Sequence, residues 1–556
     1  MDTDANAKPS ESSSILSRFN PSRFKMMPGD NWSSRLWAIA QFLLVSLLFG
    51  VAYTQDPIYY SPENQNTKYL QGLAQGGYGF LSQDWTANTL DPLPAFTALV
   101  QFTYQFIHPE YGFYLFYFLI FGVYVYSMVA IVNQVFPIRS GGAMLLTFLG
   151  LMLFCHTVHL EIFEFDIGEH LHYGVAEQYI LGPVFQPCNF GVFLLVSIYA
   201  FLKRHPYWAV VCLAIAATFH PAYFPSVLVL TLSYMGVLAW ETRSWKQPLG
   251  VGIASFLLVL PVFSYMYFMF QDTTPELAQR ATDIIVNQRI PHHSVPAEWL
   301  EDGQPYVQMI VVAIALYLVR QTRLFYVLIL PFVAAVVLTI VQMQISNDFV
   351  AFIAPWRISV FLVPVGTCIV LGWAVTALFK QFPTVTKRRS PFIARLSLVL
   401  LLTLVIFGGI NQYSKFQKND DTFAMMNFIR DSKQSGETYL IPADSKILRK
   451  FRLYTGAPIY INRKTHPYLD TEVIAWNERL EKAEEFYGSR GVQSCRMLRQ
   501  EFLPKGVTHV VLPRENMNRR CKQLKRVYRD ESYGVFTTER LNRRQANKES
   551  DRLQKG

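Results

Sequence analysis

The sequence predicts an α-helical polytopic membrane protein that ends in a small α/β domain. Hydrophobic residues make up 51% of the 556 residues and charged residues only 16%, whereas soluble proteins contain roughly 25% charged residues. Apolar runs recur from residue 35 to residue 411. The net charge of +10 is concentrated after residue 411, so the membrane part and the last part of the chain differ in composition.

Eleven apolar runs have or approach the length needed to cross a bilayer. They lie at residues 35–54, 112–133, 141–157, 187–202, 206–220, 223–240, 248–270, 306–320, 324–342, 358–379 and 394–411. The first run follows the polar, Ser-rich residues 1–34, for which we expect disorder and a cytoplasmic location. Because no small-residue cleavage site follows this run, we interpret it as a retained signal anchor.

The basic residues divide the loops into two alternating sets. Lys and Arg accumulate in the N-terminal segment and in alternate loops, and such loops face the cytoplasm. The loops with few basic residues are expected on the other side: residues 55–110, 158–186 and 271–304. This alternation requires that residues 93–108 do not span, and their polar stripe suits a helix along the membrane surface. The last domain, residues 412–540, is then expected outside the cytoplasm.

Titratable side chains gather in these outer loops, while the centres of the spans hold almost no charge. Proton-coupled transporters and channels usually keep ionisable groups at mid-depth. We therefore expect any chemistry to take place at the outer membrane surface. The residues offer no basis for a nucleic-acid partner, and they leave the oligomeric state undetermined.

The residues after 411 alternate between strand and helix patterns, which predicts a small α/β domain. We expect helices at 420–435 and 470–487, and strands at 438–442, 457–462, 507–513, 526–528 and 533–538. Residues 541–556 are charged and expected to be disordered. Cys495 and Cys521 could form a disulfide or remain thiols, because spacing does not fix their separation. The positive charge of this domain has two interpretations, a solvated surface or contact with anionic headgroups or a pyrophosphate-linked substrate.

Several segments resemble a bacterial family of polytopic membrane proteins of unassigned function. They are residues 64–74, 84–85, 87–89, 91–92, 291–293, 355–359 and 506–511. The long first outer loop, its amphipathic helices and the carboxylates at the outer interface also resemble the GT-C superfamily of membrane glycosyltransferases. The resemblance covers about residues 40–540 and implies a location in the bacterial plasma (inner) membrane.

The GT-C resemblance implies a sugar donor carried on a polyprenyl phosphate or pyrophosphate, with membrane lipids as the surroundings. It also implies that an acid of the first outer loop is a general base or helps hold a metal. By position, Glu63, Asp84 or Asp91 could do this. The cofactor stays undetermined, with a divalent metal (Mg²⁺ or Mn²⁺) as one option, and no residue is assigned as a metal ligand.

Among these acids we prefer Asp84 as the base, because neither helix nor strand accounts for its place before Trp85. Asp91 precedes Pro92, a pattern typical of helix capping, although it could also bind substrate. Glu63 follows Ser61 and Pro62, another helix-start pattern, so stabilisation of a helix dipole explains it nearly as well as catalysis.

The third outer loop and the start of a late span carry the remaining candidates. Arg289, His292 and His293 lie near prolines and could clamp a phosphate or exchange protons, or they could be incidental polar side chains of a surface loop. Arg357 could pair with a diphosphate or could extend to lipid headgroups. The segment 169–172, with two histidines and Glu169, also permits a metal, although its spacing matches no specific motif.

Two functions follow from these patterns. The first is a glycosyltransferase that moves a sugar from a polyprenyl-phosphate-linked donor at the outer face of the membrane. The second is a non-enzymatic membrane transporter or a scaffold for envelope polysaccharide. A transporter commonly shows repeated halves, and the sequence shows no internal repeat, which favours the transferase.

Overall fold

The structure is a computed structural model that describes residues 32–53, 55–162, 165–301, 303–345, 351, 354–417, 420–518 and 520–541. The predicted disordered tails lie outside these residues almost entirely and stay predictions. The chain divides into two units, Met1–Val45 and Ser46–Gly556. The described part of the first unit belongs to the apolar helix α1 (Trp32–Tyr53), and all contacts below lie within the second unit.

Every predicted apolar run forms a helix. Among the described residues, seven helices are long and apolar enough to cross a membrane, and four shorter apolar helices accompany them. Besides α1 they are α5 (Tyr111–Val132), α6 (Gly142–Thr157), α8 (Val192–Leu202), α9 (Pro206–Phe219), α10 (Phe224–Thr242), α11 (Lys246–Met269), α15 (Gln304–Val319), α16 (Arg323–Ile345), α18 (Ser359–Gln381) and α19 (Pro383–Lys415). Most of α18 is buried among the other helices, whereas α11 and α19 expose apolar side chains along their length, as helices that contact lipid do.

The loops between these helices carry short elements of their own. The first loop holds α2 (Gln65–Lys68), α3 (Leu70–Gln75), η3 (Leu81–Gln83), η4 (Thr86–Asn88), α4 (Pro94–Phe102) and the π-helical turn η5 (Thr103–Ile107). The second holds β1 (Glu161–Ile162), β2 (Phe165–Asp166), α7 (Ile167–His170) and, at its end, η6 (Pro187–Gly191), and η7 (Pro221–Tyr223) precedes α10. The third holds α12 (Pro275–Asp283), η8 (Ile284–Arg289), α13 (Pro291–Ser294) and α14 (Pro296–Leu300), and η9 (Pro355–Ile358) precedes α18.

The helix expected over residues 93–108 is present as α4 and η5, and Phe102, Phe106 and Ile107 of this segment are exposed. Apolar side chains on one face of such a helix suit a position at the membrane surface. The helices of the third loop were not predicted. Thr274 begins α12, since its hydroxyl accepts a hydrogen bond from the Leu277 amide.

The C-terminal domain contains a four-stranded sheet of order β3-β4-β6-β5, in which only the β3–β4 pair is parallel. Its elements are α20 (Phe423–Ser432), β3 (Tyr439–Leu440), η10 (Ile447–Lys450), α21 (Phe451–Thr455), α22 (Asp470–Gly488), α23 (Val492–Met497), η11 (Leu498–Phe502), η12 (Leu503–Lys505), β4 (His509–Pro513), α24 (Arg514–Met517), β5 (Lys525–Arg529) and β6 (Tyr533–Thr537). The predicted central strand is β4, which is paired on both sides and carries buried residues on both faces.

Two details of this domain were open or wrong in the sequence analysis. Residues 457–462 form no named strand, and Ile459 makes only an isolated bridge to Tyr439. Cys495 and Cys521 are joined by a disulfide, with their Cα atoms 4.9 Å apart.

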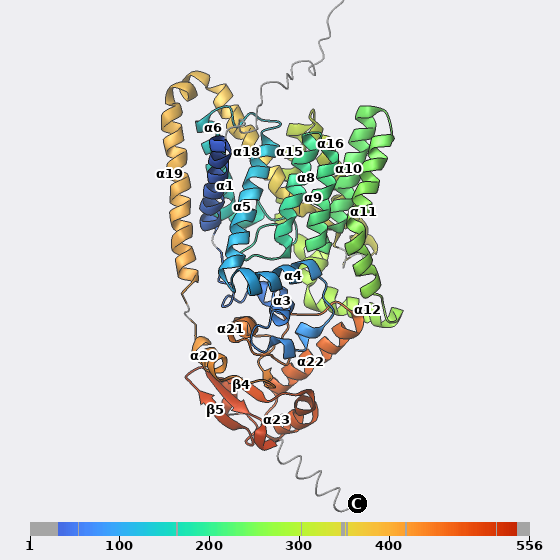
Figure 1. Cartoon of the computed structure of the whole chain (residues 1–556), viewed down its shortest axis with the longest axis vertical. Helices are drawn as coiled ribbons and strands as arrows, with labels where there is room; N and C mark the ends of the chain where they lie inside the picture. The colour runs from blue at the N-terminus through green and yellow to red at the C-terminus, as the bar shows by residue number, and fades with distance from the viewer. Residues whose placement is uncertain are drawn as a thin grey trace, which may run out of the picture. The chain divides into compact units, whose positions relative to one another are not determined.

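The C-terminal domain packs against the first and third loops, with α3 and α12 next to it (Figure 1). Ala281, Ile284 and Ile285 of the third loop share a buried apolar cluster with α22. At the first loop, the Phe80 amide donates to the Gly456 carbonyl at 2.8 Å. Gly79 faces this glycine so closely that a Cβ atom would lie 2.3 Å from the Gly456 oxygen, so no larger residue fits.

Candidate functional site

A small pocket, partly open to solvent, lies where the first loop meets the C-terminal domain. Its lining comes from two segments of the first loop and one of the domain: Thr67, Lys68, Leu70, Gln71, Thr86, Thr89, Leu90, Asp91, Pro92, Leu93, Thr97, Thr465, His466, Pro467 and Tyr468. Short helices α2 and α3 present Lys68 and Gln71, and the Pro467 turn before α22 presents His466 and Tyr468. The pocket therefore exists only because the domain packs on the loop.

Cationic side chains from separate segments converge on Tyr468. The Lys68 ammonium lies 5.9 Å from the centre of the Tyr468 ring. Burial by itself would raise the pKa of the Tyr468 phenol, but the charges of Lys68, Arg357 and Arg289 outweigh it and lower that pKa. Charges of cations from the first loop, the third loop and the start of α18 thus act on one phenol.

A second group of cations adjoins the first through Arg289. Its Nη2 atom donates to the Lys464 carbonyl at 2.8 Å. Burial, followed by the charges of Arg289 and Arg449, lowers the pKa of Lys464 to about 8. Burial likewise lowers the pKa of Arg289 to about 10. We call Lys68, Arg289, Arg357, Arg449 and Lys464 the cationic cluster.

The cationic cluster has one carboxylate near it, Glu63, whose charge acts on Lys464, but no close ion pair among the described residues. All five side chains are of intermediate exposure, and among the described residues none of them forms an ion pair with a carboxylate. The Nε atoms of Arg289 and Arg357 are buried without a hydrogen-bond partner. Because an unmade hydrogen bond of a buried charged donor is costly, this arrangement suits a site that receives an anion with several oxygen atoms.

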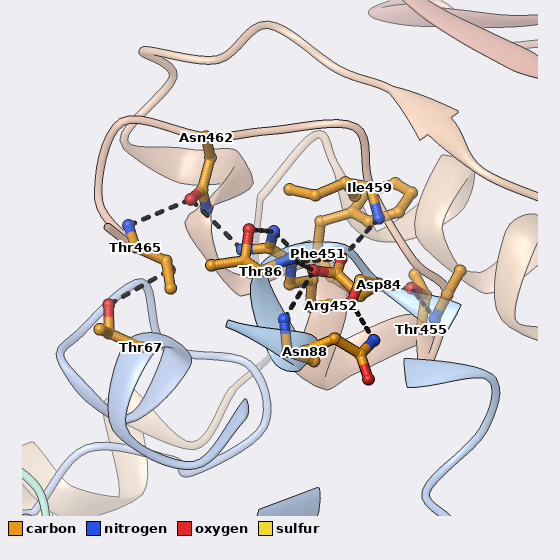
Figure 2. Close-up of polar contacts among 12 residues, drawn as sticks. Thr67, Asp84, Thr86, Asn88, Phe451, Arg452, Thr455, Ile459, Asn462 and Thr465 are labelled. Carbon is orange, nitrogen blue, oxygen red and sulfur yellow. Dashed lines mark hydrogen bonds and ion pairs between the residues drawn. The ribbon is translucent and has the colours of Figure 1, made fainter. Parts of the chain in front are cut away.

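Asp84 lies outside this pocket, in a buried ion pair. Its carboxylate accepts from Arg452 Nε at 2.7 Å and Nη2 at 3.0 Å, and neither side chain is more than 1% exposed (Figure 2). The amides of Thr86 and Ile459 also donate to it, each at 2.9 Å. A carboxylate so fully occupied and so far from solvent is poorly suited to accept a proton from a substrate. These contacts favour a structural role for Asp84 over the role of base.

Trp85, the second residue of the segment 84–85, also contacts the C-terminal domain. Its ring packs against the buried apolar cluster of the C-terminal domain, and the Arg479 guanidinium lies 4.4 Å from the ring centre. Both residues of the motif therefore bind the first loop to the domain.

Asp91 and Glu63 are the carboxylates at the pocket and the cationic cluster. Asp91 lines the pocket, and its Oδ1 accepts from the Leu93 amide at 2.8 Å. This turn precedes α4, whose N-cap is Leu93, so Asp91 stabilises the approach to the helix without being the N-cap. Burial raises the pKa of Asp91. Burial, followed by the charge of Asp56, raises the pKa of Glu63 against the opposing charges of Lys464 and Arg449.

The two histidines of α13 do not supply positive charge. Their ring centres lie 4.1 Å apart. His293 Nδ1 lies 2.9 Å from the Ala176 carbonyl and must donate to it. Burial, followed by the charges of His292 and Arg357, lowers the pKa of His293 to about 3, so its ring is neutral at pH 7. Burial also lowers the pKa of His292. This geometry leaves proton exchange open and does not favour a cationic phosphate clamp by these residues.

A metal site finds no support in the arrangement of side chains. Across the part of the chain that the structure describes, no three His, Cys, Asp or Glu side chains come together as ligands could. In the segment 169–172, His172 Nε2 is 2.7 Å from the Tyr53 hydroxyl, and nearby His159 Nδ1 is 2.8 Å from the Asp166 carboxylate. We therefore derive no chemical step through a metal.

Sequence reasoning missed Lys464, His466 and Tyr468, and it did not assign Lys68 or Arg449 to the site. The only local signal is the run of polar and basic residues from 462 to 468, interrupted by Pro467. Nothing in that run points to the first loop, which lies almost 400 positions earlier.

Comparisons with known proteins give a short family match and several similar solved structures. A family model described as a domain of unknown function (DUF6798) matches residues 420–483, the part that carries Arg449, Lys464 and Tyr468. None of the curated proteins compared with this chain matches it.

Two of the similar solved structures are of ArnT from Cupriavidus metallidurans. The one bound to undecaprenyl phosphate has 12% identity and a TM-score of 0.45, covering 90% of this chain and 98% of that chain. The one in the apo state has 11% identity and a TM-score of 0.45, covering 91% and 98%. A likeness at this identity and TM-score does not by itself assign an activity to the chain, which is a multi-pass helical membrane protein with a small C-terminal mixed sheet.

Proposed function

We propose that this protein is a membrane glycosyltransferase that takes a sugar from a polyprenyl-phosphate-linked donor at the outer face of the membrane. The observation that carries the proposal is the cationic cluster. Cations from the first loop, the third loop, the start of α18 and the C-terminal domain gather without a close ion pair to a carboxylate among the described residues. Phosphate is the anion that matches several converging Lys and Arg donors.

The position of the cluster supports a lipid-linked phosphate over a soluble one. Arg357 lies in η9, directly before the apolar helix α18, and so stands at the end of a span. The exposed apolar side chains of α4 and η5 belong to the same loop as Lys68. A polyprenyl chain could therefore stay in the bilayer while its phosphate reaches the cations.

The reaction needs a base and stabilisation of the leaving phosphate. In our proposal an acceptor hydroxyl attacks the anomeric carbon of the sugar, and its proton passes to the Asp91 carboxylate. The bond between the anomeric carbon and the phosphate oxygen breaks, and the polyprenyl phosphate leaves with its added charge held by Lys68, Arg289 and Arg357. Glu63 is the second carboxylate to be tested.

Binding and turnover can be measured separately on the full-length protein in detergent. The probe is a polyprenyl phosphate, followed by a panel of polyprenyl-phosphate-linked sugars in a sugar-release assay. We expect Arg289→Leu and Arg357→Leu each to weaken phosphate binding by at least about tenfold, the loss typical of one charged hydrogen bond. Arg496→Leu is the matched control, because Arg496 is exposed on α23.

The outcomes separate the two functions considered above. Failure of the wild-type protein to bind the polyprenyl phosphate would contradict the proposal. Binding without release of any sugar from the panel, with or without an added acceptor, would instead favour the non-enzymatic transporter or scaffold. Sugar release that persists in EDTA would show that no divalent metal is needed.

A further inference from the structure

A continuous chain of polar contacts leads from the buried Asp84–Arg452 pair to the wall of the pocket (Figure 2). Arg452 Nη1 donates to Asn462 Oδ1 at 3.3 Å. The same oxygen accepts from the Thr465 amide at 3.1 Å. The Thr465 hydroxyl lies 3.3 Å from the hydroxyl of Thr67. This series of contacts therefore begins and ends in the first loop.

The Thr67–Thr465 contact lies directly beside residues of the pocket and of the cationic cluster. Thr67 precedes Lys68, and Thr465 lies between Lys464 and His466. The Thr67–Thr465 contact therefore joins the first loop to the C-terminal domain one residue away from both Lys68 and Lys464. Asn462 is held on its other side, since its carbonyl accepts from Trp476 Nε1 at 3.1 Å.

A role in stability alone does not explain this arrangement. Burying an ion pair costs so much desolvation that well-packed apolar residues often stabilise as much or more. What a bidentate pair adds is a fixed orientation, because the two hydrogen bonds from Nε and Nη2 form together only when the guanidinium and the carboxylate are nearly coplanar. That orientation also fixes where Arg452 Nη1 points, and with it the position of Asn462 Oδ1.

We propose that Asp84, Arg452 and Asn462 are positioning residues that set the register between Lys68 and Lys464 across the interface of the first loop and the C-terminal domain. The proposal rests on the proposed function for its consequence in turnover, but the geometric claim can be tested without a substrate. In this view the domain completes the anion site and does not merely cover it.

The test is a cross-linking reporter in the full-length protein, with Thr67→Cys and Thr465→Cys introduced together. The rate at which a mild oxidant joins this pair measures the approach of the two segments. We expect Arg452→Lys, which keeps the charge but loses the planar fork, to slow cross-linking by about tenfold, the worth of one charge-assisted hydrogen bond. Asn462→Leu should act similarly, because it removes the shared acceptor.

Two variants distinguish positioning from stability. Asn462→Asp keeps the acceptor oxygen and replaces the Nδ2 group, which is buried without a partner, so it should cross-link within about twofold of the parent. Lys450→Met breaks a different buried pair of the same domain, with Asp420, and should lower the melting temperature without changing the cross-linking rate. In turnover assays without the reporter, Asn462→Leu should raise the KM for the lipid-linked donor more than it lowers kcat.

Unchanged cross-linking in both Arg452→Lys and Asn462→Leu would overturn the proposal, and so would equal slowing in Lys450→Met. If the cross-linking results hold but no polyprenyl phosphate binds, the positioning geometry stands and the proposed function fails. The two failures are therefore distinguishable.

Discussion

The Asp84 carboxylate and the Arg452 guanidinium are 368 positions apart in the chain and form a bidentate ion pair with neither side chain more than 1% exposed. This pair joins the first loop to the C-terminal domain. The sequence around Asp84 did not reveal this contact, because an acid before a tryptophan in a loop can equally be a base or an anchor.

Breaking this pair should destabilise the protein strongly. Arg452→Met leaves Asp84 buried with its charge unpaired, which typically costs about 3–5 kcal/mol. We expect a clearly lower midpoint in thermal unfolding of the full chain in detergent. The exposed pair Lys482–Glu485 is the comparison, and Lys482→Met should shift the midpoint little, because surface ion pairs contribute little. Similar shifts in both variants would contradict the assignment of Asp84 as an anchor.

The choice of base can be tested by comparing two isosteric substitutions. Asp91→Asn should lower the rate of sugar release by about 10²-fold or more, the usual contribution of a general base, with little change in phosphate binding. Asp84→Asn should instead lower the melting temperature, and its residual turnover per folded molecule should exceed that of Asp91→Asn. A larger loss of kcat in Asp84→Asn at equal folded fraction would restore Asp84 as the base.

The apolar spans were predictable because bilayer thickness sets the length of an apolar run, so α5, α11 and α18 each leave a local pattern. The amphipathic repeat of α22 was predictable because a helix with one buried face also leaves a local pattern in the sequence. The strand expected at 457–462 was wrong. Its apolar residues are buried in the core of the domain beside β3, but they make only one isolated bridge and so form a loop.

Of the residues in the proposed site, the sequence singled out the carboxylates Glu63 and Asp91 and the cations Arg289 and Arg357. Arg289 and Arg357 stood out as cations in loops with few others, and the structure brings both to Tyr468. Lys464 and Tyr468 could not be assigned, because a contact between distant segments leaves no periodic trace in either. The partner of Asp84 could not be found for the same reason, since Arg452 carries no mark of that pairing in the sequence.

The disulfide between Cys495 and Cys521 should matter for the stability of the C-terminal domain. It closes a loop over a sequence separation of 26 residues, and loss of such a cross-link typically costs about 3 kcal/mol. Cys495→Ala with Cys521→Ala should lower the melting temperature, and a reductant should do the same to the wild-type protein but not to the double variant. Because disulfides persist in oxidising compartments, the wild-type protein from membranes should resist thiol labelling at these positions. Ready labelling there before reduction would contradict the bond and weaken the expected extracytoplasmic location.

Phosphate binding should weaken as the pH rises through 8, because Lys464 loses its proton there. Burial and then the charges of Arg289 and Arg449 lower the pKa of Lys464 from 10.5 to about 8. The cluster therefore carries one charge less at pH 9 than at pH 7, while a phosphate monoester is already fully ionised. We expect the affinity for a polyprenyl phosphate to fall by about tenfold over this interval, as for the loss of one charged hydrogen bond.

The stability of the free protein should change in the opposite direction over the same range. A group whose pKa is lower in the folded state binds its proton more weakly there than in the unfolded chain. The contribution of Lys464 to the free energy of unfolding therefore rises between pH 8 and pH 10.5, where the unfolded chain holds the proton and the folded protein does not. Lys464→Arg is the matched control, because a guanidinium stays protonated. It should keep binding at pH 9 and abolish this gain in stability, and a pH dependence of binding unchanged by Lys464→Arg would remove Lys464 from the anion site.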